Sequence, residues 1–246
     1  MNIGIYQSAA SMSALERWQD SVTQNISSAQ LPGYRKRSVE FSAQPNGQIQ
    51  TGSSSSGDSK TSLFPSAATS ISFTPGEAQS TGKALDVAIQ GPGFFEVQTA
   101  GGEKAYTRDG EFQVQPDNTV TTASGQQVLL ESGSPLTLVQ AGGAVVINPD
   151  GTVMQNGTAL GKLSIQEFAN PSQLTVASSG TFTPAAGQTP TPVTNPSLLQ
   201  GYVEESNVSP MHEMVDLITI SRAYESNQKM ITTVDQEMQK TLDALG

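Results

Sequence analysis

Both ends of this chain carry apolar residues at helical spacing, whereas the stretch between them does not. Within residues 3–30 the apolar positions advance by three or four residues at a time, about 3.5 on average, which draws one narrow stripe along a helix. Residues 210–245 repeat the pattern, with Ser221 and Gln228 as polar steps. Since neither stripe has an apolar neighbour in the chain, the simplest solution pairs the two ends with each other. The sequence therefore predicts a building block that assembles through its ends, with a β-rich body between them.

The terminal helices supply the candidate assembly residues. The first helix is expected to end at Leu31-Pro32-Gly33, because proline cannot continue a helix. The second is expected to begin at Pro210, because proline suits the first helical position. Trp18 and Tyr224 fit two roles equally well, as anchors at a subunit contact or as core residues between the paired helices. The full candidate set is Ile5, Met12, Leu15, Trp18, Val22, Asn25, Ile26, Met214, Ile218, Arg222, Tyr224, Ile231, Val234 and Met238.

The middle of the chain is typical of short strands. In residues 81–183 apolar and polar positions alternate, and turn signals such as Asp109-Gly110 and Asn156-Gly157 interrupt them at short intervals. This spacing predicts an antiparallel β-rich domain. Two polar stretches flank it. Residues 43–80 have too little apolar surface to offset the entropy of ordering and are expected to be flexible or extended, and residues 184–196 form a proline-rich return linker.

The predicted fold class is therefore α+β. Paired long N- and C-terminal helices form a coiled-coil-like axial domain from residues 1–42 and 197–246, and the antiparallel β-rich domain is inserted between them. The length of 246 residues allows one or two domains. Only 35% of the residues are hydrophobic and 14% charged, so uncharged polar residues and glycine make up the difference, as suits short strands and turns.

The charge balance argues against nucleic acid as a partner. With 12 basic and 22 acidic residues the formal net charge is -10, so a polyanion is repelled over most of the surface. The one basic run, Arg35-Lys36-Arg37, is short and is followed by Glu40. We interpret it as solvated or in contact with an acidic neighbour. Cysteine is absent, which excludes a disulfide framework and a cysteine-based metal site.

The sequence shows no targeting or membrane segment. Residues 1–20 lack a cationic region, a continuous apolar core and a cleavage motif, so we expect no cleaved signal peptide. We also expect no membrane span, because no run of about 18 apolar residues occurs. A role outside the cytoplasm would require another export route.

The sequence contains few residues that are suited to catalysis. His212 is the only histidine, which excludes a histidine-based metal cluster and leaves a catalytic triad little basis. The carboxylates of Asp109, Glu111 and Asp117 fall mostly in expected turns, where such groups accept backbone hydrogen bonds. Gly91-Pro92-Gly93 lacks the spacing of a phosphate loop. We therefore expect no catalytic residue, no metal, no cofactor and no enzymatic activity.

Short motifs stand near both ends of the chain. Residues 25–35 read NISSAQLPGYR, and residues 201–208 read GYVEESNV and continue into the last helix. These stretches resemble the N- and C-terminal signatures of the axial proteins of the bacterial flagellum, specifically the basal-body rod and hook-basal-body group. The first stretch departs from the family pattern at Ser27, Ser28 and Leu31, where the family usually has Ala, Asn and Thr.

A third motif lies in the middle of the chain. Residues 91–97, GPGFFEV, and residues 106–112, YTRDGEF, are similar to two strands of the same family. Asn118 stands where the family commonly has glycine, and asparagine enters left-handed conformations more readily than most residues. The motif positions expected to be structurally important are Gly33, Tyr34, Gly91, Gly93, Phe94, Phe95, Tyr106, Thr107, Arg108, Gly110, Phe112, Ser206, Asn207 and Val208.

This resemblance implies a structural subunit of the flagellar basal-body rod. The terminal helices would form an inner tube domain with the β-domain outside it. Subunits would polymerise head-to-tail into the hollow drive shaft that transmits torque. The resemblance also implies helical stacking of copies, contact with other rod and hook-basal-body axial subunits, and export by the flagellar type III apparatus to a rod that spans the periplasm.

Three alternatives stay open. Residues 2–6, NIGIY, are more similar to the proximal rod protein, and this similarity slightly favours that protein. The C-terminal motif resembles the distal rod protein at least as much. The length argues against the larger hook-type subunit. A secreted β-rich adhesin or phage-tail-like protein also combines β-domains with terminal helices. A wall hydrolase is disfavoured, because it would need a carboxylate cleft that the sequence does not indicate.

Overall fold

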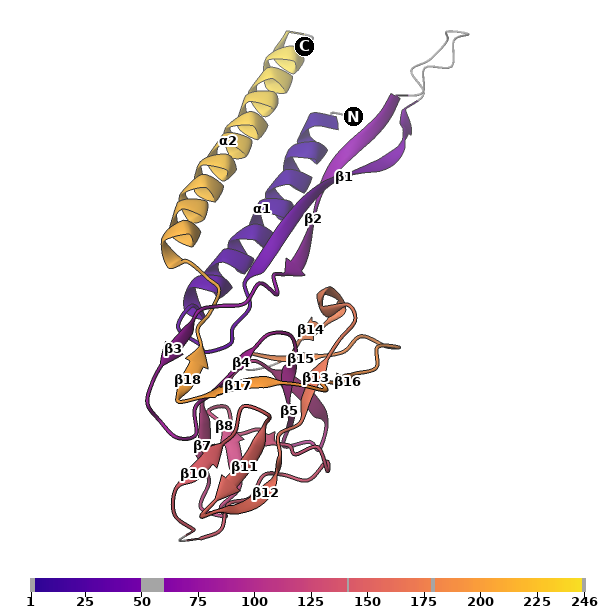
Figure 1. Ribbon diagram of the computed structural model, residues 1–246. Coiled ribbons are helices and arrows are strands. Elements are labelled where there is room, and N and C mark those ends of the chain that lie inside the picture. Colours follow the sequence, from indigo (N-terminus) through magenta and orange to yellow (C-terminus); the bar gives the residue numbers. More distant parts are fainter. Residues whose placement is uncertain (1–2, 50–59, 141, 178–179, 245–246) are drawn as a thin grey trace. The chain divides into compact units, whose positions relative to one another are not determined.

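The chain forms two compact units, each built from segments that are distant in sequence. The terminal unit comprises residues 1–27, 37–71 and 209–246, and the β-body comprises residues 28–36 and 72–208. Figure 1 shows the elements in chain order. The computed structural model describes residues 3–49, 60–140, 142–177 and 180–244, and for residues 3–4, 44–49 and 60–64 it describes the backbone alone.

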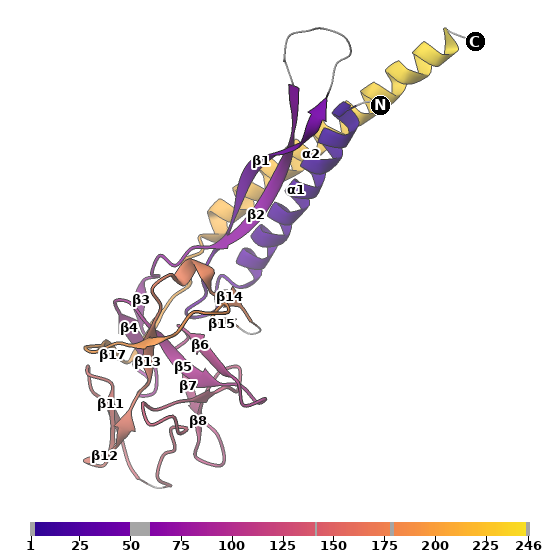
Figure 2. The ribbon, with the colours of Figure 1, turned by 90° about the vertical axis from the view of Figure 1, so that its right-hand side faces the viewer.

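The terminal unit holds both long helices and one β-hairpin. Its helices are α1 (Ile3–Ser27) and α2 (Pro210–Asp243), and its strands are β1 (Arg37–Ile49) and β2 (Lys60–Ile71). The two strands pair antiparallel, with Arg37 opposite Ile71. Within this unit α1 lies between α2 and the hairpin (Figures 1 and 2).

The two helices meet through a small apolar core. Leu15 and Val22, seven residues apart on α1, therefore share one helical face, and they pack against Ile220 of α2. All three side chains are buried. Asn25 near the end of α1 meets Glu213 near the start of α2, so the helices run antiparallel.

The fold class expected from the sequence, with paired long terminal helices in a coiled-coil-like domain, is wrong. The described residues contain two α-helices and eighteen strands in several antiparallel sheets, and the helices do not form a coiled coil. Instead, α1 divides its contacts between α2 and the hairpin: Trp18 meets Phe41 of β1 edge to face at 5.5 Å, and Arg17 donates a hydrogen bond to the Ala67 carbonyl of β2 at 3.0 Å. Helical periodicity does not distinguish a helix that packs only on another helix from one that also packs on strands.

The β-body is a set of short antiparallel strands. Its elements are β3 (Ala78–Ser80), β4 (Val87–Gln90), β5 (Phe94–Gln98), β6 (Lys104–Thr107), β7 (Phe112–Val114), β8 (Val120–Thr122), β9 (Gln127–Val128), β10 (Val145–Ile147), β11 (Thr152–Gln155), β12 (Thr158–Lys162), β13 (Ile165–Glu167), the 3-10 helix η1 (Pro171–Gln173), β14 (Thr175–Val176), β15 (Thr181–Thr183), β16 (Thr191–Pro192), β17 (Ser197–Gln200) and β18 (Tyr202–Glu204). The largest sheet has the order β14-β15-β6-β5-β9-β8-β7, and β13 joins it by pairing with both β5 and β16. The smaller sheets are β10-β11-β12, β17-β4 and β18-β3.

The alternation of side chains along each strand explains which residues form the core of the β-body. Adjacent residues of a strand point to opposite faces. Phe95 of β5 accordingly enters the main core beside Phe112, with ring centres 5.1 Å apart, while Phe94 packs with Phe168 and Phe182 at 5.9 and 5.7 Å. The main core comprises Val87, Ile89, Phe95, Phe112, Val120, Val128, Leu130, Leu136, Ile147, Val153, Leu163, Ile165 and Leu198.

Two turn expectations are confirmed by the backbone. Asn156 and Gly157 have φ of 50° and 80° and join β11 to β12, as a two-residue hairpin turn requires. Asn118 has φ of 66°, so asparagine takes the left-handed conformation at this position.

Both segments expected as polar linkers contain strand residues. Residues 43–80 include the end of β1 and all of β2 and β3, while residues 50–59 lie outside the described part of the chain. Residues 184–196 include β16, which pairs antiparallel with β13. These polar strands pair through backbone groups, so the shortage of apolar side chains does not prevent an extended structure.

Candidate assembly sites

The three sequence motifs converge on a buried ion network in the β-body. The carboxylate of Glu204 lies between two guanidiniums: Arg35 Nη2 is 2.7 Å from Oε1, and Arg108 Nη1 is 3.0 Å from Oε2. The side chains of Arg35, Glu204 and Arg108 are 1%, 4% and 6% exposed. Because isolated charges are unfavourable in such surroundings, each group depends on the others. The network joins residues from the first, middle and last motifs of the chain.

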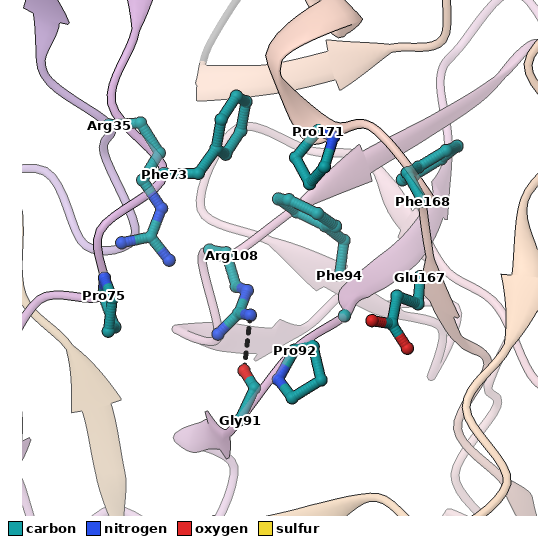
Figure 3. Close-up of a pocket in the computed structure, with 11 residues that line it drawn as sticks. Arg35, Phe73, Pro75, Gly91, Pro92, Phe94, Arg108, Glu167, Phe168 and Pro171 are labelled. Carbon is teal, nitrogen blue, oxygen red and sulfur yellow. Dashed lines mark hydrogen bonds between the residues drawn. The ribbon is translucent and has the colours of Figure 1, made fainter.

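Further contacts hold Arg108 in place. Its Nη2 donates a hydrogen bond to the Gly91 carbonyl at 2.7 Å (Figure 3), and its guanidinium carbon lies 5.3 Å from the centre of the Phe94 ring. Burial lowers the pKa of the Arg108 guanidinium; the Glu204 carboxylate opposes this shift, and the charge of Arg35 reinforces it. Arg108 therefore packs through charge, hydrogen bonding and ring contact together.

Two glycines allow the close approach of backbone to this network. Gly33 has φ of +67°, and its amide donates to the Glu204 carbonyl at 2.7 Å. A Cβ at Gly33 would lie 2.3 Å from the Arg108 carbonyl carbon. At Gly76 a Cβ would lie 1.9 Å from the Glu205 carbonyl oxygen, and the Gly76 amide donates to Glu204 Oε1 at 2.9 Å. The candidate set includes Gly33 but not Gly76 or Glu204. The sequence signal for a buried acid was the presence of two basic residues in the motifs, Arg35 and Arg108, which need a negative partner when they are buried.

Asn207 links three segments of the β-body through its amide side chain. Its Oδ1 accepts from the Lys36 amide at 2.6 Å, and its Nδ2 donates to the Ser72 and Thr74 carbonyls at 3.0 and 2.8 Å. The Asn207 amide donates to the Tyr34 carbonyl at 3.4 Å. A carboxylate at this position accepts but does not donate, so only an amide of this size can make the whole set.

The other motif residues shape the β-body around the network. Thr107 Oγ1 accepts from the Asp109 amide at 3.0 Å, and a Cβ at Gly110 would lie 1.8 Å from the Val87 carbonyl oxygen. Ser206 Oγ accepts from the Val208 amide at 3.2 Å. Gly91 and Gly93 have φ of 107° and 115°. The buried side chains of the motif set are Tyr34, Phe94, Phe95, Tyr106, Thr107, Arg108, Phe112 and Val208.

Asp109 is a half-buried acid whose pKa lies closer to neutral pH than usual. Burial raises the pKa of its carboxyl to about 6; a hydrogen bond from the Glu111 amide, at 2.9 Å, opposes the shift, and the charges of Glu111 and Asp86 add to it. The stability of the β-body therefore depends on pH through this residue.

A cavity of about 250 Å³ lies beside the ion network (Figure 3). Arg35 and Arg108 line it, and so does the exposed Glu167. Glycine backbone at Gly91 and Gly93 forms part of its wall. The remaining lining residues are aromatic or proline, namely Phe73, Phe94, Phe168, Pro75, Pro92 and Pro171.

In the terminal unit, Asn25 links three elements. Its Oδ1 accepts from the Arg37 amide at 2.9 Å, and its Nδ2 donates to the Arg37 carbonyl and to Glu213 Oε2, each at 2.9 Å. Asn25 and Glu213 are both fully buried. The asparagine of the first motif thus connects α1 to the start of β1 and to the first turn of α2.

The apolar residues of α2 lie on two faces instead of one stripe. Successive residues of a helix are rotated by about 100°, so Ile218 and Ile220 point in different directions. Ile220 is 1% exposed and packs in the core, whereas Ile218 is 55% exposed. The exposed apolar face of α2 consists of Met211, Met214, Val215 and Ile218.

The candidate residues of the terminal helices occupy three environments. Sequence reasoning missed Ile220 and Glu213; Ile220 stands four residues before Tyr224, which is the helical signal that marks it. Trp18 and Tyr224 pack against the small core. Of the candidates, Leu15, Val22 and Asn25 are buried, Ile5, Met12, Trp18, Ile26, Tyr224, Ile231 and Val234 are half-buried, and Met214, Ile218, Arg222 and Met238 are exposed.

Among the described residues, no group of three or more His, Cys, Asp or Glu side chains is placed to hold a metal ion. Neither of the helices that the structure describes is long and apolar enough to span a membrane.

Comparison with known proteins identifies the family. Residues 199–244 match the model described as flagellar basal body rod FlgEFG protein C-terminal, and residues 88–183 match the flagellar hook protein FlgE/F/G D1 domain. The chain is 30% identical over 246 residues to the flagellar basal-body rod protein FlgF of Caulobacter vibrioides, covering 100% of this chain and 99% of the relative. FlgF of Mesorhizobium japonicum is 30% identical over 249 residues with the same coverage. The flagellar basal-body rod protein FlgG of Borreliella burgdorferi is 31% identical over 251 residues, covering 94% of each chain.

The chain belongs to the family of flagellar basal-body rod proteins. Its relatives are structural proteins, and membership places the chain in the flagellar basal body as a rod subunit that assembles with other axial subunits. The full-length matches to FlgF fit the slight preference for the proximal rod protein.

Proposed function

We propose that this chain polymerises head-to-tail through its terminal unit into the hollow rod that transmits torque. The observation that carries the proposal is the exposed apolar face of α2, where Met211, Met214, Val215 and Ile218 adjoin each other over two helical turns. Contiguous exposed apolar surface of this kind marks a protein contact. A heterologous contact, which joins two different patches, generates an open helical assembly.

The free energies of burial and association indicate that several contacts must act together. Fully burying one apolar side chain contributes about 1.5–3 kcal/mol, so four of them contribute at most about 12 kcal/mol. Association itself costs about 4–15 kcal/mol in lost freedom and ordering. One such face is therefore marginal for a single pair of subunits, and a tube in which each subunit has several neighbours supplies the difference.

The proposal includes the location and organisation of the subunit. In this proposal the terminal unit, residues 1–27, 37–71 and 209–246, forms the inner tube, and the β-body, residues 28–36 and 72–208, forms the outer domain. The rod spans the periplasm, and the flagellar type III apparatus exports the subunit without a cleaved signal peptide. Copies of the chain and other rod or hook-basal-body subunits are its partners. No chemical step is needed, because torque passes through packed contacts.

A charge placed on the exposed apolar face tests the proposal. We expect Ile218→Glu to leave folding unchanged within about 0.5 kcal/mol, because the side chain is exposed, and to abolish incorporation into basal bodies purified from the source bacterium. Gln228→Glu is the matched control, since it adds the same charge at an exposed polar position of α2. Incorporation of the Ile218→Glu chain at the level of the control would refute the proposal.

A further inference from the structure

The ion network beside the 250 Å³ cavity carries an excess of positive charge. Arg35 and Arg108 supply two positive charges and Glu204 supplies one negative charge, all on buried side chains. Within the described residues, the Nε atoms of both arginines are buried without a hydrogen-bond partner. Buried charge without compensation is unfavourable. An anionic group in the cavity would therefore be stabilised by both guanidiniums.

The cavity itself does not supply that group. Glu167 is the acidic residue among its lining side chains, and it is exposed. Among the ion pairs of the described residues, none joins Glu167 to Arg35 or Arg108. The excess charge is thus left to an acid from outside the β-body.

The size and walls of the cavity favour a protein side chain as the occupant. Pockets for drug-sized molecules are usually about 300–1,000 Å³, so this one suits one or two amino-acid side chains better. Rings such as Phe73 and Phe168 beside arginine are typical of the desolvated centre of a protein interface. Arginine also binds carboxylates with strong charge-assisted hydrogen bonds.

We propose that the cavity is a socket for a carboxylate-bearing segment of a second copy of this chain. The carboxylate faces Arg35 and Arg108, and neighbouring apolar atoms of the segment contact the aromatic and proline walls. A second copy offers many acids, since the chain has 22 acidic and 12 basic residues. A head-to-tail contact joins two different patches, so the segment and the socket lie on different parts of the chain. This inference rests on the proposed assembly of the chain into a rod.

Site-specific photo-cross-linking tests the socket in intact basal bodies. A photoreactive amino acid replaces Pro75, which is exposed and lines the cavity, and the matched control carries it at Ser132, an exposed residue outside the cavity. We expect the Pro75 position to capture a second copy of the chain, through a peptide that contains Asp or Glu. The Ser132 position should not capture that peptide.

The outcomes separate the socket from the proposed function. Absence of the chain from basal bodies contradicts the rod assembly itself. If the chain is present, capture of another protein, capture of a peptide without an acid, or no capture at Pro75 overturns the socket alone.

Removing the acid at the cavity edge provides a second measurement. Glu167 competes with an incoming carboxylate, and its exposed side chain can be changed without disturbing the core. We expect Glu167→Gln to raise the cross-linking yield from the Pro75 position about twofold and Glu167→Lys to raise it further, as for partly screened charge pairs. Ser132→Lys adds the same charge outside the cavity and should leave the yield unchanged. An unchanged or lowered yield in both Glu167 variants counts against the socket.

Discussion

At the scale of single residues, the β-body depends on one carboxylate between two guanidiniums. Replacing Glu204 by Gln keeps the shape and removes the negative charge, which leaves Arg35 and Arg108 buried without a counter-charge. We expect the free energy of unfolding to fall by about 3–5 kcal/mol, measured by urea unfolding of the purified chain. Glu205→Gln, at the exposed neighbouring position, should change it by less than about 0.5 kcal/mol. Equal losses in the two variants would show that burial of the network does not matter.

A pair of glycines separates backbone strain from close approach. Gly33 and Gly82 have φ of +67° and +70°, but a Cβ would meet Arg108 at Gly33 and nothing within 4 Å at Gly82. Gly82→Ala should cost about 1 kcal/mol for the left-handed backbone. Gly33→Ala should cost at least about 2 kcal/mol more, because the segment must also move away from Arg108. Thermal unfolding of both variants measures the difference, and similar melting temperatures would contradict this account.

Asp109 gives the β-body a pH dependence of known sign. Its pKa is about 6 in the folded chain against 3.8 as the ordinary value, so the folded state binds the proton more tightly. Its stabilising contribution is complete below pH 3.8 and is lost as pH rises through 6. Between about pH 4 and pH 7, we expect Asp109 to lower the unfolding free energy of the wild-type chain by about 2–3 kcal/mol. The Asp109→Asn variant should lack this decline. Asp117→Asn is a control of opposite sign, because hydrogen bonds from Thr119 lower the pKa of Asp117. Parallel pH profiles for the wild-type and Asp109→Asn chains would exclude Asp109 as the source.

At the scale of elements, α2 has one buried face and one exposed apolar face. Ile220 faces the core with α1, and Ile218, two residues earlier, belongs to the exposed apolar face. Helix α1 in turn is shared between α2 and the β1–β2 hairpin, so neither helix is a simple half of a pair. Packing inside the subunit therefore uses one surface of α2 and leaves exposed the other surface, which we propose for contacts with neighbours.

Matched alanine substitutions distinguish the two faces. We expect Ile220→Ala to lower the unfolding free energy of the terminal unit by about 2–5 kcal/mol through a core cavity, and Ile218→Ala to change it by less than about 1 kcal/mol. Trp18 fluorescence reports on this unit, since it is the only tryptophan and packs against the same core. A larger stability loss for Ile218→Ala than for Ile220→Ala would reverse the assignment of the faces.

At the scale of the whole molecule, each unit closes on segments from distant parts of the chain. The β-body needs residues 28–36 as well as 72–208, because Arg35 and Gly33 complete its ion network. The Ser72 amide donates to the Lys36 carbonyl at 2.9 Å. The two segments of the β-body are therefore adjacent at the residues that flank the β1–β2 hairpin in the chain.

This adjacency predicts a minimal folding unit. We expect residues 28–208, with 37–71 replaced by a short Gly-Ser linker, to unfold cooperatively in urea, followed by circular dichroism. The fragment 72–208 lacks Arg35 and should be less stable by about 3 kcal/mol or more. Equal stability of the two fragments would mean that the first motif contributes nothing to the β-body.

Much of the local structure could be predicted from the sequence. The helical spacing at both ends, the turn at Asn156-Gly157 and the left-handed Asn118 depend on neighbouring residues alone, and each is found in the structure. The family could likewise be inferred from short motifs at defined places. Such features are decided within a few residues, where backbone sterics and side-chain alternation act.

Tertiary structure alone decided which surfaces meet. The periodicity of α1 could not reveal that strands β1 and β2 also contact this helix. The periodicity of α2 could not show which of its apolar residues are buried and which are exposed. The partnership of Arg35, Glu204 and Arg108 joins residues that lie far apart in the chain. Burial and charge pairing act between groups that folding brings together, so they leave no local pattern; the sequence determined the elements and the family, and the packed chain determined their partners.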